Sequence, residues 1–361
     1  MHVPHYLSYD GELTAGGRQR TVRDISRIMQ LDCKWDVVIA QKSNRDWQRI
    51  DCDGTTVIGL SSRLDIYGDP EFGWKTARLL KFPSDAILYM GGEDAYPFFV
   101  KNAKGYHVGV WWDGPHSGFA KYLTGLRTQL MFSRCRTIAC CDTNIINWLR
   151  TRSGRFQAAA NNAIYIPNAV DLDALKVRSD EPPTGLLRII FARRFELKRG
   201  PYLMLEAARI LRDKGFPFRL IMSSAVGHDG SDIIELECKQ RGIVDLVETR
   251  TNCMDSVMSL YSEGDISVVP TIWSEGTSYA AVEALCAGLP VVTTTVGGLP
   301  NLVLPDHNGF VVPPRATDLA EAITIYADRS VWQRHHQNAL SMRQALSLVK
   351  WKEKVRTWLL S

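Results

Sequence analysis

ISVVPTIWSEGTSYAAVEALCAGLPVVTTT, residues 266–295, predicts a strand, a loop, a helix and a second strand. The first strand is expected over 266–271, the helix over 278–287 and the second strand over 290–295. Both predicted strands and the helix are almost continuously apolar, which is typical of elements buried on both sides in a parallel sheet. The stretch is therefore expected to be one repeat of a parallel α/β fold.

The same alternation extends outward in both directions through the second half of the chain. Short apolar runs are followed by amphipathic stretches of about ten residues, which predicts a parallel sheet covered by helices on both faces. In such sheets, ligands bind at the carboxyl ends of the strands, beside helix N-termini. The further predicted strands are 187–192, 218–223 and 246–248, and the further predicted helices are 202–214, 233–241, 254–262 and 318–327.

The first half shows the alternation less clearly, and a polar stretch with two prolines, 176–185, is predicted to link the halves. We predict two doubly wound α/β domains facing each other across a cleft. They cover 1–170 and 187–330, and a helical tail over 331–361 crosses back to the first domain. The first-half strands are expected at 35–40, 55–60, 86–90, 106–111 and 137–140, and the helices at 21–29 and 122–132.

The composition excludes several classes of protein. The chain has 361 residues, 45% of them hydrophobic and 23% charged, and a net charge of +4, which does not indicate a nucleic-acid binder. No apolar run reaches the ~20 residues of a membrane span, and the first residues lack a secretory pattern. Eight cysteines without a CxxC pair favour a reducing cytoplasm, and the histidines show no zinc spacing. Arginines between 127 and 155 are either a solvated helical surface or contacts for an anionic acceptor or membrane surface.

Two glutamates stand out from the apolar stretch around them. Glu283 is the only polar residue between 279 and 287, and a buried carboxylate costs several kcal/mol unless it has partners. Glu283 therefore either forms an internal ion pair or faces a polar ligand. Glu275 lies where a strand ends and a helix is about to begin, so the ligand interpretation gains weight for the pair.

The residues after Glu275 favour a phosphate site. Gly276 allows the backbone to approach a ligand closely, and Thr277 or Ser278 is the expected N-cap of the helix. The N–H groups and dipole of a helix N-terminus attract anions, whereas ionised carboxylates accept hydrogen bonds from hydroxyls. Phosphate donors between two hydroxyl acceptors outline a nucleotide-sugar site.

The chain resembles glycosyltransferase family 4, whose retaining enzymes have the GT-B fold. The family signature is a Glu, seven residues and a second Glu, which is the spacing of Glu275 and Glu283. Further segments resemble the family in the same order along the chain: IYIPNAVD (164–171), FARRFELKRG (191–200), AGLPVV (287–292), GGLP (297–300) and NGFVVP (308–313).

The resemblance implies roles for the residues in these motifs. Glu275 would contact the hydroxyls of the donor sugar and Glu283 the ribose of the nucleotide. Arg194, together with Lys198 or Arg199, would bind the diphosphate and stabilise the leaving group, because negative charge develops there. Each of these cations is otherwise a solvated loop charge.

The first half resembles the family in fewer places. Gly17, in AGGR (15–18), corresponds to a glycine loop that approaches the donor phosphate, although an ordinary turn would look the same. His116, in WWDGPHS (111–117), stands where the family often has an active-site histidine, and Asp113 competes for that role. Asn301 and Ala169 depart from the family pattern, which has Glu and Gly there.

The resemblance implies a hexosyltransferase-type enzyme that moves a sugar from a UDP or GDP donor to a glycan or lipid-linked acceptor with retention. Surface polysaccharide or glycoconjugate synthesis in the cytoplasm or at the inner membrane face, with no metal or other cofactor, is the expected setting. The alternatives are a GT-B sugar-nucleotide epimerase or phosphorylase, and a catalytically silent binding partner with the same fold.

Overall fold

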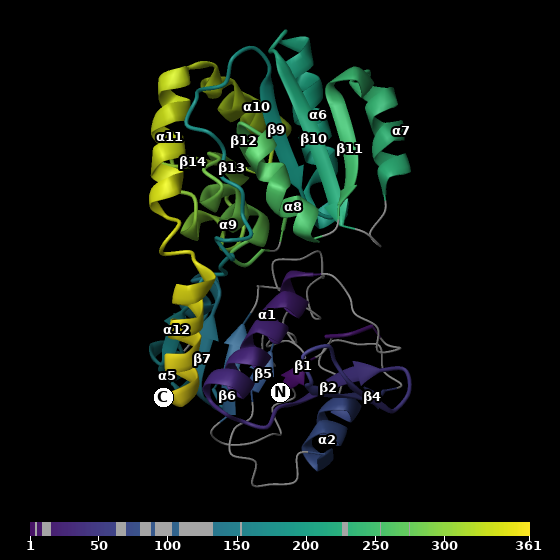
Figure 1. The fold of residues 1–361 in the computed structure, drawn as a ribbon, viewed down its shortest axis with the longest axis vertical. Coiled ribbons are helices and arrows are strands. Elements are labelled where there is room, and N and C mark those ends of the chain that lie inside the picture. The colour runs from purple at the N-terminus through teal and green to yellow at the C-terminus, as the bar shows by residue number, and fades with distance from the viewer. Residues whose placement is uncertain are drawn as a thin grey trace. The chain divides into compact units, whose positions relative to one another are not determined.

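A computed structural model describes residues 1–3, 6–8, 16–62, 70–79, 88–90, 103–107, 133–151, 154–225, 230–252, 254–273 and 275–361. The chain divides into two compact units. Unit 1 contains Met1–Pro167 and the terminal Trp351–Ser361, and unit 2 contains Asn168–Lys350. Figure 1 shows the elements of each unit with their labels.

Unit 2 contains a six-stranded parallel sheet with the order β11-β10-β9-β12-β13-β14. The chain starts at β9 in the middle, builds outward through β10 and β11, and then returns to place β12 on the other side of β9. The order therefore reverses between β9 and β12, which is the position where open α/β sheets bind ligands. The strands are β9 (Leu187–Ala192), β10 (Phe218–Ala225), β11 (Val247–Asn252), β12 (Ile266–Val269), β13 (Val291–Thr294) and β14 (Gly309–Val312).

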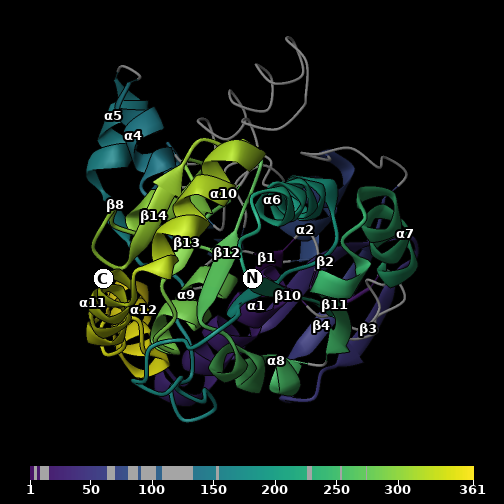
Figure 2. The same ribbon diagram turned by 90° about the horizontal axis from the view of Figure 1, so that it is seen from above.

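Helices cover both faces of this sheet, because alternate strand residues point to opposite sides. Ile189 and Phe191 pack with α6, α7 and α10, whereas Ile190 packs with α8 and α9. Figure 2 shows α6 and α10 on one side of the sheet and α8, α9 and α11 on the other. The helices are α6 (Pro201–Asp213), α7 (Ser231–Arg241), α8 (Met254–Leu260), α9 (Tyr279–Cys286), α10 (Ala316–Thr324) and α11 (Arg329–Ser341).

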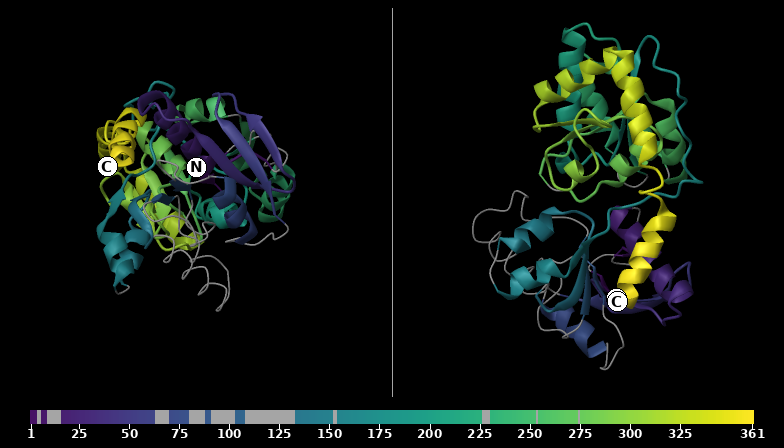
Figure 3. Two further views of the ribbon diagram at one scale, coloured as in Figure 1. Left: turned by 90° about the horizontal axis from the view of Figure 1, so that it is seen from below. Right: turned by 90° about the vertical axis from the view of Figure 1, so that its left-hand side faces the viewer.

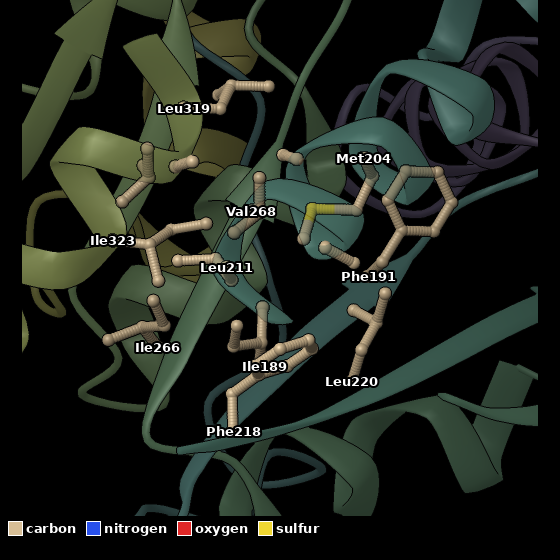
Figure 4. Close-up of a cluster of buried hydrophobic side chains, with 14 of the residues drawn as sticks. Ile189, Phe191, Met204, Leu211, Phe218, Leu220, Ile266, Val268, Leu319 and Ile323 are labelled. Atoms are coloured by element: carbon tan, nitrogen blue, oxygen red, sulfur yellow. The ribbon is translucent and has the colours of Figure 1, made fainter. Parts of the chain in front are cut away.

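The larger apolar core of unit 2 lies between the sheet and the α6–α10 layer. Figure 4 shows Met204 and Leu211 of α6 beside strand residues, with Leu319 and Ile323 of α10 next to them. All four of these helix side chains are completely buried. This packing fixes the strands, and with them the loops that leave their carboxyl ends.

Unit 1 contains an eight-stranded sheet with the order β3-β4-β2-β1-β5-β6-β7-β8, in which only β3 runs antiparallel to its neighbour. Its order reverses between β1 and β5, as in unit 2 between β9 and β12. The strands are β1 (His2–Val3), β2 (Val38–Ser43), β3 (Trp47–Ile50), β4 (Thr56–Ser61), β5 (Leu88–Met90), β6 (Ala103–His107), β7 (Cys135–Cys140) and β8 (Ala163–Tyr165).

The last helix of the chain, α12, follows α11 and is yellow in Figure 3. Its residues from Trp351 onward belong to unit 1. Lys104 of β6 donates to the Trp358 carbonyl oxygen at 3.0 Å, and the Tyr106 and Trp358 rings meet edge to face at 6.0 Å. None of the helices in the described ranges is long and apolar enough to cross a membrane. The helices are α1 (Gly17–Arg27), α2 (Pro70–Leu79), α4 (Asn144–Arg150), α5 (Arg155–Asn161) and α12 (Leu348–Leu360).

The unit boundaries differ from the predicted domain boundaries in two places. The stretch predicted as a linker packs within unit 2, because Arg178 is buried and its guanidinium lies 3.0 Å from Asp265. The helical tail predicted over 331–361 is also divided. Trp332 of α11 is buried in the core of unit 2, and only Trp351–Ser361 clusters with unit 1. The Arg178–Asp265 pair accounts for the first difference, and the burial of Trp332 accounts for the second. Hydrophobic periodicity in the sequence reveals neither contact.

Candidate functional site

Three loops at the carboxyl ends of β9, β12 and β13 pack together in unit 2. Gly200 has a left-handed φ of 78°, and a Cβ there would lie 1.9 Å from the Pro270 carbonyl oxygen. Gly297 has φ 59°, and a Cβ there would lie 1.9 Å from the Glu275 carbonyl oxygen. Only glycine fits at these two contacts. They hold the β9 and β13 loops against the β12 loop, and so place Glu275 beside the point where the strand order reverses.

The Glu275 carboxylate lies between two arginines of the β9 loop. Arg199 Nη1 donates to Oε2 at 2.6 Å, Arg193 Nη2 donates to the same oxygen, and the Thr271 hydroxyl donates to it at 3.1 Å. All three donors therefore share Oε2. In the described part of the chain, Oε1 receives no hydrogen bond. The Glu275 side chain as a whole is 10% exposed.

These contacts keep Glu275 ionised. Burial alone would raise the pKa of the carboxyl, but Arg199 and Arg193 outweigh it and lower the pKa to about 2. A carboxylate with this pKa only accepts hydrogen bonds at neutral pH, and it is a weak general base because efficient bases have pKa values near the working pH.

The structure distinguishes the three predicted phosphate-binding cations of the β9 loop. Arg199 contacts Glu275, whereas Arg194 Nη1 lies 2.7 Å and Lys198 Nζ 3.1 Å from the carboxylate oxygens of Glu196. Arg194 and Lys198 side chains are 32% and 26% exposed, and Arg199 is 19% exposed. Arg199 is therefore the predicted cation that the structure brings to Glu275.

Glu283 is buried in α9, as its apolar surroundings predicted, and has 7% exposure. The Tyr261 hydroxyl donates to its Oε2 at 3.0 Å. Tyr261 is itself fully buried, in the 3₁₀ turn Tyr261–Glu263 that follows α8. One partner of Glu283 is thus a tyrosine hydroxyl rather than a cation.

Gly276, Thr277 and Ser278 are buried between Glu275 and α9. Ser278 is the N-cap residue of the helix, and no side chain caps it by a hydrogen bond. The Thr277 hydroxyl accepts from the backbone N–H of Asn168 at 2.9 Å, and the Asn168 amide donates to the Thr277 carbonyl oxygen. Thr277 therefore joins the PNAV segment to the signature segment, a contact that the sequence did not predict.

A second buried carboxylate, Asp265, lies at the amino end of β12. Its Oδ1 accepts from Arg178 at 3.0 Å and from Arg188 at 3.2 Å, and its Oδ2 accepts from the Arg188 backbone N–H at 2.7 Å. The residue is 1% exposed, so both of its oxygens are used inside the protein.

In unit 1, Gly17 begins α1 and is exposed. His116 and Asp113 lie outside the described residues, as do Trp111 and Trp112. A different histidine, His107, ends β6 and is fully buried. Burial, and to a smaller extent the nearby Arg18 charge, lower its pKa to about 3. His107 is therefore neutral at physiological pH.

Unit 2 is similar in sequence to known glycosyltransferases. Residues 176–339 match the family model described as "Glycosyl transferases group 1". Two curated relatives are the D-inositol 3-phosphate glycosyltransferase of Streptomyces bingchenggensis, 29% identical over 148 residues, and the putative colanic acid biosynthesis glycosyltransferase WcaL of Escherichia coli, 28% identical over 167 residues. The alignments cover 39% and 44% of this chain, and 32% and 40% of the relatives' lengths. Residues 176–339 of this chain, most of unit 2, are therefore similar to the group 1 glycosyltransferases.

Solved structures extend the likeness to the whole chain. WaaG, a glycosyltransferase involved in lipopolysaccharide biosynthesis, gives a TM-score of 0.74 at 16% identity and covers 98% of each chain. Anabaena HepE, solved with UDP and glucose, gives 0.71 at 16% identity and covers 100% of this chain and 99% of its own. The fold is therefore GT-B, with two Rossmann-like units, as predicted.

Sequence reasoning missed three residues that contact the two glutamates. Arg193 and Thr271 bind Glu275, and Tyr261 binds Glu283. Arg193 is adjacent to Arg194 in the same motif, so an alignment alone does not say which guanidinium turns inward. Tyr261 precedes β12 and Thr271 follows it, both in apolar sequence. Neither side chain carries a charge that would single it out.

Proposed function

We propose that this chain transfers a sugar from a UDP or GDP donor to a hydroxyl of a glycan or lipid-linked acceptor, in the synthesis of a polysaccharide or glycoconjugate. The observation that carries the proposal is the Glu275 carboxylate. It is ionised, held by one oxygen and placed where the strand order of unit 2 reverses. A fixed acceptor at that position suits the hydroxyls of a donor sugar. The UDP and glucose in the solved HepE structure support a nucleotide-sugar donor.

The loop after β9 supplies the charge that sugar transfer requires. When the glycosidic bond breaks, negative charge grows on the departing diphosphate, and cations fixed nearby lower the barrier. Arg199, Arg194 and Lys198 come from one loop and provide three such cations. In the proposed mechanism a diphosphate oxygen takes the acceptor proton, since Glu275 is too weak a base. Retention of configuration is part of the proposal and follows from the family resemblance.

The donor nucleotide is proposed to bind with Glu283 on its ribose and the turn through Gly276 and Ser278 on its phosphates. Thr277 is proposed to contribute to this turn as well, and the Asn168 backbone N–H holds its hydroxyl in place. Gly17 of unit 1 is proposed as a further phosphate contact, since it begins α1 and is exposed.

We also propose that transfer needs no metal ion. The chain has two Asp-x-Asp triplets, a pattern that can hold a metal, and both are used in turns. Asp51 accepts from the backbone N–H groups of Asp53 and Thr55 at 2.9 Å, and Asp171 accepts from that of Asp173 at 3.1 Å. Full transfer activity in EDTA is the expected result, and restoration of lost activity by Mg²⁺ or Mn²⁺ would contradict it.

The acceptor is proposed to be presented at an anionic membrane surface on the cytoplasmic side. Arg134, Arg136 and Arg150 of unit 1 are exposed. Clustered cations bind acidic lipid headgroups, and the attraction weakens as salt increases. Sedimentation with vesicles containing anionic lipid should therefore exceed that with neutral vesicles and fall with salt. Equal binding to both would contradict this part of the proposal.

A panel of nucleotide sugars tests the main proposal. The protein is incubated with each UDP- and GDP-sugar, with and without glycan or lipid-linked acceptors, and free nucleoside diphosphate and sugar products are measured. The expected result is acceptor-dependent release with one donor. Epimer formation without acceptor, or no binding of any nucleotide, would support the alternative enzymes or the silent binding protein instead.

A further inference from the structure

Arg193 has a place in the site that differs from that of the other cations in its loop. It is the first residue after β9, and its side chain is 5% exposed. Nη1 donates to the Thr271 hydroxyl at 2.5 Å, and Nη2 donates to Glu275 Oε2. Its backbone N–H donates to the Ser223 carbonyl oxygen of β10 at 2.9 Å. Both terminal nitrogens and the main chain are therefore engaged inside the protein.

Thr271 completes a closed set of hydrogen bonds with Arg193 and Glu275. Its hydroxyl accepts from Arg193 and donates to Glu275 Oε2 at 3.1 Å. Its own carbonyl oxygen accepts from the Thr294 hydroxyl of β13 at 2.6 Å, which fixes its backbone. A planar guanidinium that donates in two directions sets an orientation as well as a charge. The three side chains come from the loops after two neighbouring strands, so the sheet itself fixes their spacing.

This arrangement determines which carboxylate oxygen faces a ligand. The Arg193 and Thr271 donors both end on Oε2, and so does Arg199. Arg199 is 19% exposed and comes from the short 3₁₀ turn Leu197–Arg199, whereas Arg193 is 5% exposed on the end of a strand. Arg199 can turn to a phosphate while keeping a solvent-accessible position. Arg193 would have to break two buried hydrogen bonds to do so, each to a partner that would remain buried.

We propose that Arg193, with Thr271, is a positioning residue that holds Glu275 through Oε2 and so presents Oε1 to the hydroxyls of the donor sugar. The proposal rests on the function proposed above, and it assigns Arg193 no contact with the nucleotide phosphates. Its consequence is selective. Loss of the guanidinium should weaken recognition of the sugar part of the donor while leaving recognition of the diphosphate intact.

The test compares binding of a nucleoside diphosphate with binding of its nucleotide sugar, using the donor that the panel identifies. Arg193→Met should bind the nucleoside diphosphate within about twofold of wild type and the nucleotide sugar at least about tenfold more weakly, since the buried ionic contact that orients Glu275 toward the sugar is lost. Arg178→Met is the matched control. It removes a buried arginine paired with Asp265 on the opposite end of β12, and it should lower thermal stability without changing the ratio of the two affinities.

Two outcomes would overturn the proposal. Parallel weakening of both ligands by Arg193→Met would mean that Arg193 binds the phosphates. Unchanged binding of both would mean that Arg193 only stabilises the fold. If wild type binds no nucleotide sugar, the proposed function fails before this comparison begins, so the two failures are distinguishable.

Thr271 provides a second test that does not depend on a buried arginine being removable. Thr271→Ser keeps the hydroxyl and should retain the wild-type ratio of affinities, whereas Thr271→Val removes it and should weaken the nucleotide sugar alone. The pH dependence adds a readout that a packing role would not change. Loss of the Arg193 charge should raise the pKa of Glu275 above about 2, so sugar-donor binding should fail at a higher pH than in wild type. The same ratio of affinities in Thr271→Ser and Thr271→Val would contradict the proposal.

Discussion

β12 of unit 2 has a buried carboxylate near each end, and each carboxylate is paired with two arginines. Asp265 precedes the strand and pairs with Arg178 and Arg188, and Glu275 follows it and pairs with Arg193 and Arg199. The clusters differ in how the oxygens are used. Donors from the protein reach both oxygens of Asp265, whereas the three donors to Glu275 all end on Oε2.

This difference distinguishes a structural ion pair from a candidate ligand-binding site. Asp265 is 1% exposed, and its pair with Arg178 holds the stretch 176–185 against the sheet, which stabilises the fold. Glu275 is 10% exposed, lies at the carboxyl end of the strand and keeps one oxygen available. Each cluster has one carboxylate and two arginines, so the direction of the strand and the use of the second oxygen distinguish the cluster that we propose binds a ligand.

The largest expected effect comes from neutralising each carboxylate in turn. Glu275→Gln should lower kcat/KM by at least about 100-fold, because a charged contact made with the reacting sugar is lost. Asp265→Asn should leave kcat/KM per folded molecule unchanged but lower the free energy of unfolding by about 3 kcal/mol, since Arg178 stays buried without its charge partner. Transfer assays and urea unfolding on both variants measure this. An active Glu275→Gln enzyme would remove the basis of the comparison.

Glu275 is expected to contribute to stability as well, which its sequence position alone did not predict. Its removal leaves two arginines without this carboxylate as a charge partner, and one of them is only 5% exposed. Activity must therefore be expressed per folded molecule, with the folded fraction taken from the unfolding curve.

A smaller effect is expected within the β9 loop. Arg199→Met should weaken donor use about 10- to 100-fold, as for loss of a charged hydrogen bond. Lys198→Met should cost less than about fivefold, because Lys198 pairs with Glu196 and not with Glu275, and it is more exposed than Arg199. Steady-state kinetics with varied donor give the comparison. A greater loss for Lys198→Met would reverse the assignment that the structure favours.

Tyr261→Phe should have a milder effect. It removes the hydroxyl that donates to Glu283 at 3.0 Å and should raise the donor KM about fivefold, with kcat little changed. Tyr326→Phe is the matched control, since it removes another buried tyrosine hydroxyl of unit 2, bonded to His335 at 3.1 Å. An equal change in KM for both variants would mean that Tyr261 acts only through stability.

The smallest expected effect is on the pH dependence of the stability of the fold. The pKa of Glu275 is lowered from 4.5 to about 2 in the folded protein, so its ionisation stabilises the fold above about pH 4.5 and this contribution is lost as pH falls towards 2. The difference in Tm between wild type and Glu275→Gln should be constant from pH 5 to 7 and shrink below pH 4.5. Thermal melts across pH 3–7 measure it, and a difference that does not change with pH would show that Glu275 is not held ionised.

The fold of unit 2 was largely predictable from its sequence, because strands such as β9 and helices such as α6 bury continuous or periodic apolar stretches. The sequence also singled out Glu283, since a charge within apolar sequence is conspicuous, and Glu275, by its position between a strand and a helix. The tail and linker were assigned differently because single long-range contacts, Arg178 with Asp265 and Trp332 in the core, decide where they pack. Arg193 was missed for a similar reason, since rotation about the end of a strand determines which of two adjacent arginines points inward.

The most direct measurement of the central claim is a thermal-shift titration of wild type, Glu275→Gln and Asp265→Asn with UDP- and GDP-sugars. A ligand that binds only the folded protein raises Tm with concentration. We predict that one nucleotide sugar raises the Tm of wild type and of Asp265→Asn by the same amount, and that of Glu275→Gln by clearly less. An undiminished shift in Glu275→Gln, or the absence of a shift with every nucleotide sugar in wild type, would contradict the assignment of the donor site to the carboxyl end of β12.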